Sequence, residues 1–154
     1  MTLWDFALEA WERPEVAGAC LDLQDQHGQC VTLLLWRAWA AAEGRPAHPQ
    51  IRAQAIELAR AWESGVIVHL RAARRGLAER PEAVDAPIFE RLRKALRSAE
   101  LEAEETLIKA LEALTPEPAG AHAGSLARVL ASLMDSWNGS RAETAALSLA
   151  AALR

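Results

Sequence analysis

A chain of 154 residues with 51% apolar and 25% charged side chains has the composition of one globular domain and argues against intrinsic disorder. Its net charge of −4 disfavours a nucleic-acid partner, because proteins that bind phosphate backbones usually carry a clear excess of basic side chains. The longest apolar run, Val31 to Ala42, is interrupted by Arg37 and is too short to cross a bilayer, so no membrane association is expected.

The charges are unevenly distributed along the chain. Residues 1–36 carry a net charge of −5, residues 37–97 carry +5, and residues 98–154 carry −4. Oppositely charged segments attract one another when a chain packs. The basic middle of the chain is therefore expected to attract the acidic ends when the chain packs.

Helix-spaced apolar residues run through almost the whole chain, and alternating strand patterns are missing. Thr2 with Asp5 is typical of a helix start, Pro14 suits the first turn of a second helix, and Gly28 is a natural stop for it. The third helix, from Val31 to Glu43, is apolar around nearly its whole circumference. This pattern predicts that other helices enclose it.

Two long helices are predicted in the middle of the chain. One apolar stripe continues from Ile51 to Leu77, past the helix-unfavourable pair Ser64-Gly65, which favours one long, kinked helix over two separate ones. After a turn that contains proline, with Asp85 as a candidate cap, residues 87–114 carry the clearest helical periodicity of the chain.

The C-terminal part predicts a loop over 115–124, a helix over 126–137 and an alanine-rich, lightly docked helix within 140–154. Taken together, the elements predict an all-α single domain over residues 1–154. We expect a bundle of six or seven helices with a buried, central third helix.

Cys20, His27 and Cys30 are the first candidates for chemistry. Three soft ligands without a close cysteine pair do not complete a structural zinc site, and Cys20 falls on the apolar stripe of its helix. Cys30 lies near a helix start and near His27, but no acid or oxyanion loop completes a catalytic set. We therefore predict no catalytic residue, no metal site and no cofactor.

Gln24 and Asp25 end the second helix and are more informative. A carboxylate near a helix C-terminus meets the unfavourable end of the helix dipole, so Asp25 should have a compensating partner such as Arg71, Arg74 or Arg75. Two interpretations remain open. Either these side chains tie the turn between helices, or they line a polar pocket that receives a ligand or a partner group.

Arginines form the strongest surface feature of the fourth helix. Arg71 and Arg75 lie opposite the stripe that contains Trp62, so they are expected to face solvent or a partner. Planar guanidinium groups suit the recognition of carboxylate or phosphate. Gln24, Asp25, Arg71, Arg74 and Arg75 are thus the candidate binding residues.

Several stretches carry a resemblance to a known family. They are W-x-F at Trp4 to Phe6, ACLxLQDxxG at Ala19 to Gly28, V-x-LLL-x-x-x-W at Val31 to Trp39, LRAARR at Leu70 to Arg75, and the acidic stretch around Glu100 to Glu105. Over about residues 3–114 the chain resembles a family of uncharacterised bacterial proteins, mainly proteobacterial, with a domain of unknown function. The resemblance implies a small helical cytoplasmic protein and supplies no activity. Thr32 stands where members often carry asparagine.

The sequence favours a non-catalytic cytoplasmic protein that acts through protein–protein interaction as a regulator or adaptor. The alternative is a small-molecule-binding protein or enzyme with a polar pocket around Gln24, Asp25 and the arginines of the fourth helix. Self-association through the helix over 87–114 is a third prediction.

Overall fold

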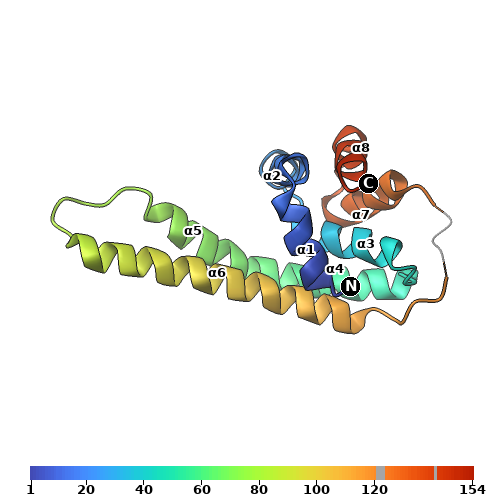
Figure 1. Ribbon diagram of the computed structural model, residues 1–154, viewed down its shortest axis with the longest axis horizontal. Coiled ribbons are helices and arrows are strands. Elements are labelled where there is room, and N and C mark those ends of the chain that lie inside the picture. The colour runs from blue at the N-terminus through green and yellow to red at the C-terminus, as the bar shows by residue number, and fades with distance from the viewer. Residues whose placement is uncertain (121–123, 141) are drawn as a thin grey trace.

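The computed structural model describes residues 1–120, 124–140 and 142–154, and all regular structure in those ranges is helical (Figure 1). This confirms the predicted all-α single domain. The helices are α1 (Leu3–Glu12), α2 (Pro14–His27), α3 (Val31–Ala42), α4 (Pro49–Trp62), η1 (Glu63–Ile67), α5 (Val68–Gly76), α6 (Ala86–Leu114), α7 (Leu126–Asn138) and α8 (Glu143–Ala152).

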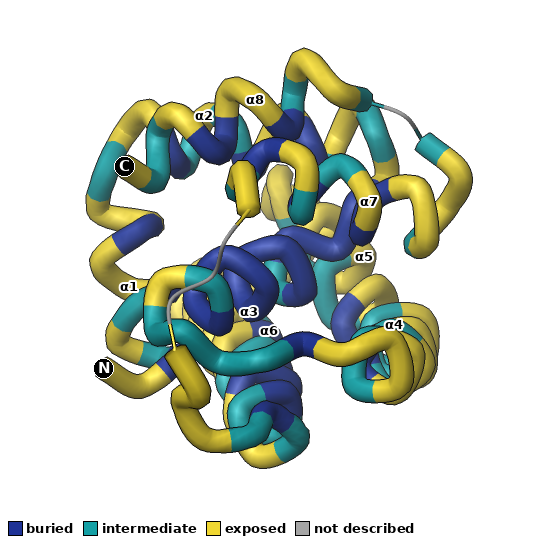
Figure 2. The backbone as a smooth tube through the Cα atoms, turned by 90° about the vertical axis from the view of Figure 1, so that its right-hand side faces the viewer, coloured by how far each residue is buried: buried dark blue, intermediate teal, exposed yellow. Residues whose placement is uncertain are grey.

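Helix α3 is the centre of the core. Nine of its twelve residues are buried, and it packs against α1, α6 and α7. Figure 2 shows it as a mostly dark blue coil between the other helices. The indole of Trp36 donates to the Thr115 hydroxyl at 2.7 Å, and that of Trp39 donates to the Met1 carbonyl at 3.0 Å. Each buried indole N–H thus has an acceptor, as burial requires.

Helices α4 and α5 form one continuous rod. The backbone keeps helical angles through η1, a π-helical turn at Glu63–Ile67, where the Ser64-Gly65 pair lies. The structure therefore agrees with the prediction of one long, irregular helix.

The rod runs back along α6, and the indole of Trp62 donates to the Ala103 carbonyl at 2.8 Å. Helix α5, the turn after it and the first half of α6 project beyond the other helices as an arm (Figure 1). Near the base of the arm, Arg75 of α5 lies 3.8 Å from Asp25 of α2.

Several helix ends lie at the residues that the sequence indicated. The Thr2 hydroxyl accepts the Asp5 backbone N–H at 3.1 Å, and the Asp85 carboxylate accepts that of Ile88 at 3.1 Å. Gly28 ends α2 with φ 59° and ψ 30°, a left-handed conformation that favours glycine. Gly28 thus marks where the α2–α3 turn begins.

The last helix differs from its prediction. Helix α8 packs against α2 and α7, and Ala146, Leu149 and Ala150 on it are almost fully buried. It is therefore docked firmly rather than lightly, because small side chains let helix backbones approach closely. Of the loop predicted over 115–124, residues 121–123 lie outside the described residues. Within the described ranges, no helix has both the length and the apolar character to span a membrane.

Candidate functional site

A cleft lies at the corner between α1, α2 and the rod of α4 and α5. Two adjoining cavities of about 80 and 340 Å³ share the wall residues Gln24, Glu63 and Arg71, and we call the two together the inner cleft. Its apolar end is lined by Trp4, Leu8, Trp11, Leu101 and Ile108. Its polar end is lined by Asp25, Gln29, Cys30, Arg75 and Trp137.

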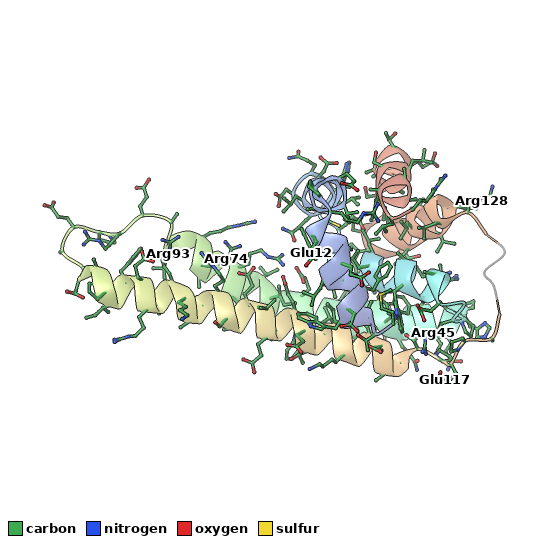
Figure 3. All side chains as sticks on the ribbon, in the orientation of Figure 1. Glu12, Arg45, Arg74, Arg93, Glu117 and Arg128 are labelled. Carbon is green, nitrogen blue, oxygen red and sulfur yellow. The ribbon has the colours of Figure 1, made fainter. Side chains whose placement is uncertain are left out.

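Four of the five candidate binding residues line the inner cleft. Gln24, Asp25, Arg71 and Arg75 all contribute to it, although α2 and α5 are far apart in sequence. Arg74 also lies on α5 but lines neither cavity. Its guanidinium forms an ion pair with Glu100 instead. In Figure 3 the labelled Arg74 lies on the arm, far from Arg45 and Arg128.

The turn between α2 and α3 is held from α7, which the sequence did not indicate. The Asn138 amide donates to the His27 carbonyl at 2.8 Å, and the Trp137 indole donates to the Gly28 carbonyl at 3.0 Å. Neither Gln24 nor Asp25 makes these bonds. In the sequence Asn138 stands out only as part of a helix-ending Asn-Gly pair, since its distance of more than 100 residues from the turn hides the contact.

Gln29, a wall residue of the polar end, is 4% exposed. Its Nε2 donates to Asn138 Oδ1 at 2.8 Å. The Asn138 amide nitrogen faces carbonyls, which can only accept, and this fixes the orientation of both side chains. Gln29 Oε1 is therefore a buried acceptor, and it has no hydrogen-bond partner among the residues that the structure describes.

Arg71 is the charged centre of the cleft. Its guanidinium lies 3.1 Å from Glu63, 3.3 Å from Glu100 and 3.1 Å from Glu104. The side chain is only 14% exposed, so of the two predicted surroundings, solvent or a partner, Arg71 does not face open solvent. The π-helical turn contributes Glu63 to this cluster, and α6 contributes the other two carboxylates, so three glutamates replace the water that an exposed arginine would bind.

Burial and ion pairing shift the pKa values of Arg71, Glu100 and Glu104 in different directions. Burial opposes the charge of Arg71, but Glu63, Glu100 and Glu104 outweigh it and raise the pKa of the guanidinium. Burial likewise works against ionisation of Glu100, but Arg74 and Arg71 outweigh it and lower that pKa. For Glu104, burial prevails over Arg71 and raises the pKa. Two neighbouring carboxylates on α6 are thus shifted in opposite directions.

Asp25 and Arg75 form the open edge of the polar end. Their charged atoms lie 3.8 Å apart, and the side chains are 49% and 62% exposed. The Gln24 amide donates to the Asp25 carboxylate at 3.3 Å. An exposed pair at this distance is weak, so both groups remain able to bind something else.

The cysteines of the α2 and α3 region do not form a reactive centre. Cys20 and Cys30 are buried free thiols, and burial raises the pKa of each to about 12. At neutral pH both thiols are therefore protonated and poorly nucleophilic. Among the described residues, no group of His, Cys, Asp and Glu is arranged to hold a metal ion. The inner cleft thus combines apolar side chains at one end with charged side chains at the other.

The chain matches the family model described as "Protein of unknown function (DUF2390)" over residues 2–111. The chain belongs to this family. Membership confirms the resemblance to a family without an assigned activity, while a bacterial source remains a prediction. No curated protein and no solved structure matches the chain. The matched range contains every residue of the inner cleft except Trp137 on α7, so the cleft lies almost wholly in the part that defines the family.

Proposed function

We propose that the protein is a non-catalytic interaction protein, of the adaptor or regulatory type, that holds a segment of another protein in its inner cleft. The apolar end of the inner cleft is the main support for this proposal. Its side chains Leu8, Trp11 and Leu101 are 45%, 42% and 52% exposed, and all three line the same cavity. Single exposed apolar side chains are common on protein surfaces. Three that converge on one hollow beside charged groups are typical of an interaction site.

The polar end favours a partner segment that carries a carboxylate near a bulky apolar side chain. Arg75 is mostly exposed and lies 3.8 Å from Asp25, beyond hydrogen-bond distance. Its N–H donors are therefore open to a planar acceptor with two oxygens. Arg71 is less suited to this role, because three glutamates already engage its guanidinium.

The proposal places this interaction in the cytoplasm of a bacterial cell. Both cysteines are free thiols, which supports a reducing compartment. The bacterial source rests on the family resemblance. Neither nucleic acid nor a membrane is part of the proposal.

Site-specific photo-crosslinking in cells that naturally make the protein tests the proposal. A benzophenone amino acid replaces Leu101 at the cleft, and in a control it replaces Leu147 on α8, which is 57% exposed. We expect a crosslinked partner from position 101 that is absent from position 147. Added Trp11→Asp or Arg75→Glu substitutions should reduce its yield by about tenfold, because a lost apolar anchor or charge pair costs on the order of 1–2 kcal/mol.

The proposal fails if both positions give the same products. It fails equally if the product from position 101 is unaffected by both cleft substitutions. Circular dichroism of each variant verifies that the helices are retained, which we expect because Trp11 and Arg75 are both exposed.

Binding of a small-molecule ligand is the second candidate function. The Gln29 Oε1 atom, a buried acceptor without a hydrogen-bond partner among the described residues, favours it. A buried amide oxygen without a partner costs on the order of 1–3 kcal/mol. Gln29 belongs to the wall of the 340 Å³ cavity, and a small donor that reached its Oε1 from there would remove this cost. Native mass spectrometry of freshly purified protein tests this candidate: a bound compound adds mass that Gln29→Leu abolishes, and a bare polypeptide mass argues against it.

A further inference from the structure

Helix α6 presents one long side to solvent. Arg91, Lys94, Ser98, Glu102 and Glu105 recur at intervals of three or four residues, so they fall on one side of the helix, which we call the α6 outer face. The first four are exposed and Glu105 is partly exposed. In Figure 1, α6 forms the lower edge of the molecule, and no other helix lies beneath it.

Between Arg91 and Glu105, the charges of the α6 outer face are symmetric about Ser98 in position and opposite in sign. Lys109 lies one turn beyond this stretch on the same side of the helix, and its ammonium is 2.6 Å from the Glu105 carboxylate. Arg91 and Glu105 each lie seven residues from Ser98, and Lys94 and Glu102 each lie four residues from it. The remaining glutamates of this region, Glu100 and Glu104, turn inward to the arginines of α5. They therefore do not disturb the pattern on the outer face.

We propose that the α6 outer face binds the same face of a second copy of this chain, with the two helices antiparallel and a two-fold axis near Ser98. A two-fold axis brings position i of one copy opposite position j of the other and repeats the contact. Arg91 then meets Glu105 of the second copy, and Lys94 meets Glu102. Each contact occurs twice, which gives four attractive pairs.

The same charges disfavour a parallel arrangement of the two helices. Parallel helices in register would place each basic side chain against its own copy. The small side chain of Ser98 at the axis permits a close approach of the two backbones. Ile88, which is 53% exposed, and Ala95 lie next to the α6 outer face and would supply apolar contact in the dimer. Exposed ion pairs contribute little individually, so the dimer is expected to be weak and sensitive to salt.

Two charge-reversed variants test the pairing. Arg91→Glu with Lys94→Glu turns all four contacts repulsive, and so does Glu102→Lys with Glu105→Lys. Sedimentation velocity over a concentration series in low salt should show dimerisation of the natural chain. The dissociation constant should rise by at least about tenfold in each variant alone, because four contacts change sign.

Mixing the two variants gives the decisive readout. In a mixed pair, the acidic side chains of one variant face the basic side chains of the other in all four contacts, so the mixture should dimerise about as well as the natural chain. A natural chain that stays monomeric at millimolar concentration would overturn the proposal. Variants that dimerise unchanged, or a mixture that does not recover, would also overturn it. All four substituted positions have side chains at the surface, so folding should persist, and circular dichroism verifies this.

Discussion

Glu100 and Glu104 occupy successive turns of α6 and share Arg71, yet their pKa values are shifted in opposite directions. Glu100 also receives Arg74, and two guanidinium groups outweigh the cost of its burial. Glu104 has only Arg71, whose charge is divided among three carboxylates. Burial raises the pKa of both carboxylates; two guanidinium groups reverse this at Glu100, whereas Glu104 has Arg71 and also faces the negative charges of Glu100 and Glu63.

Replacing these two glutamates should have opposite effects on the pH dependence of stability. The pKa of Glu100 is lowered on folding, so its stabilisation is present above the unfolded-state pKa of about 4.3 and disappears as the pH falls through the folded-state pKa. We expect Glu100→Gln to cost about 1–3 kcal/mol at pH 7, because it leaves two arginines undercompensated. This loss should vanish in acid.

For Glu104 the sign is reversed. Its pKa is raised on folding, so ionisation weakens the fold as the pH rises from the unfolded-state pKa through the folded-state pKa. Glu104→Gln should therefore remove this decline and cost less than Glu100→Gln at pH 7. Urea unfolding of both variants between about pH 3.5 and 7.5 measures the difference. Equal losses at every pH would contradict the assignment.

At the scale of a helix, the π-helical turn at Glu63–Ile67 sets the rotation between α4 and α5. A π-helical turn inserts about one residue into an α-helix and shifts the following face by about 100°. In this protein it aims both Glu63 and Arg71 at the cleft wall while Trp62 still contacts α6. The irregularity thus lets one rod line the cleft and pack along α6.

Deleting Ser64 should convert the π-helical turn into regular α-helix. Helix α5 would then turn by about 100° and separate Arg71 from Glu100 and Glu104. We expect a loss of about 2–4 kcal/mol in the free energy of unfolding, measured by urea denaturation. Ser64→Ala is the matched control, since it removes only an exposed bond to the Arg60 carbonyl and should cost under about 0.5 kcal/mol. A deletion variant as stable as this control would contradict the role of the turn.

Across the whole molecule, burial is concentrated at one end. The core around α3 contains Trp36, Trp39 and most of the fully buried leucines. In the N-terminal part of α6, before Glu100, Phe89 alone is buried. Local stability follows the density of buried apolar contacts. The arm should therefore open more readily than the body to which it is joined.

Hydrogen exchange followed by mass spectrometry should show this gradient within the single helix α6. Backbone amides over residues 88–96 are expected to exchange at least about tenfold faster than those over 103–111, where Ala103, Leu107 and Leu111 are buried. Protection that is uniform along α6 would indicate that the arm unfolds only with the rest of the chain. Because self-association would protect the outer face, the measurement belongs at low protein concentration.

The sequence by itself determined the helical class, the central place of α3 and several helix ends, but neither the π-helical turn η1 nor the start of α8. These features depend on neighbouring residues: the spacing of apolar side chains, a capping hydroxyl at Thr2, a carboxylate at Asp85 and a glycine at Gly28 with positive φ. It also singled out Gln24, Asp25 and the arginines of α5 by their chemistry.

Only the tertiary structure decided which of those polar groups meet. Arg71 faces three glutamates rather than solvent, and the α2–α3 turn is tied by Asn138, because these contacts join segments that local pattern cannot place side by side. Helix α8 docks through small side chains whose weak apolar signal gave no hint of their burial. Periodicity reports which face of a helix is apolar, but the partner of each polar side chain depends on how the helices pack in three dimensions.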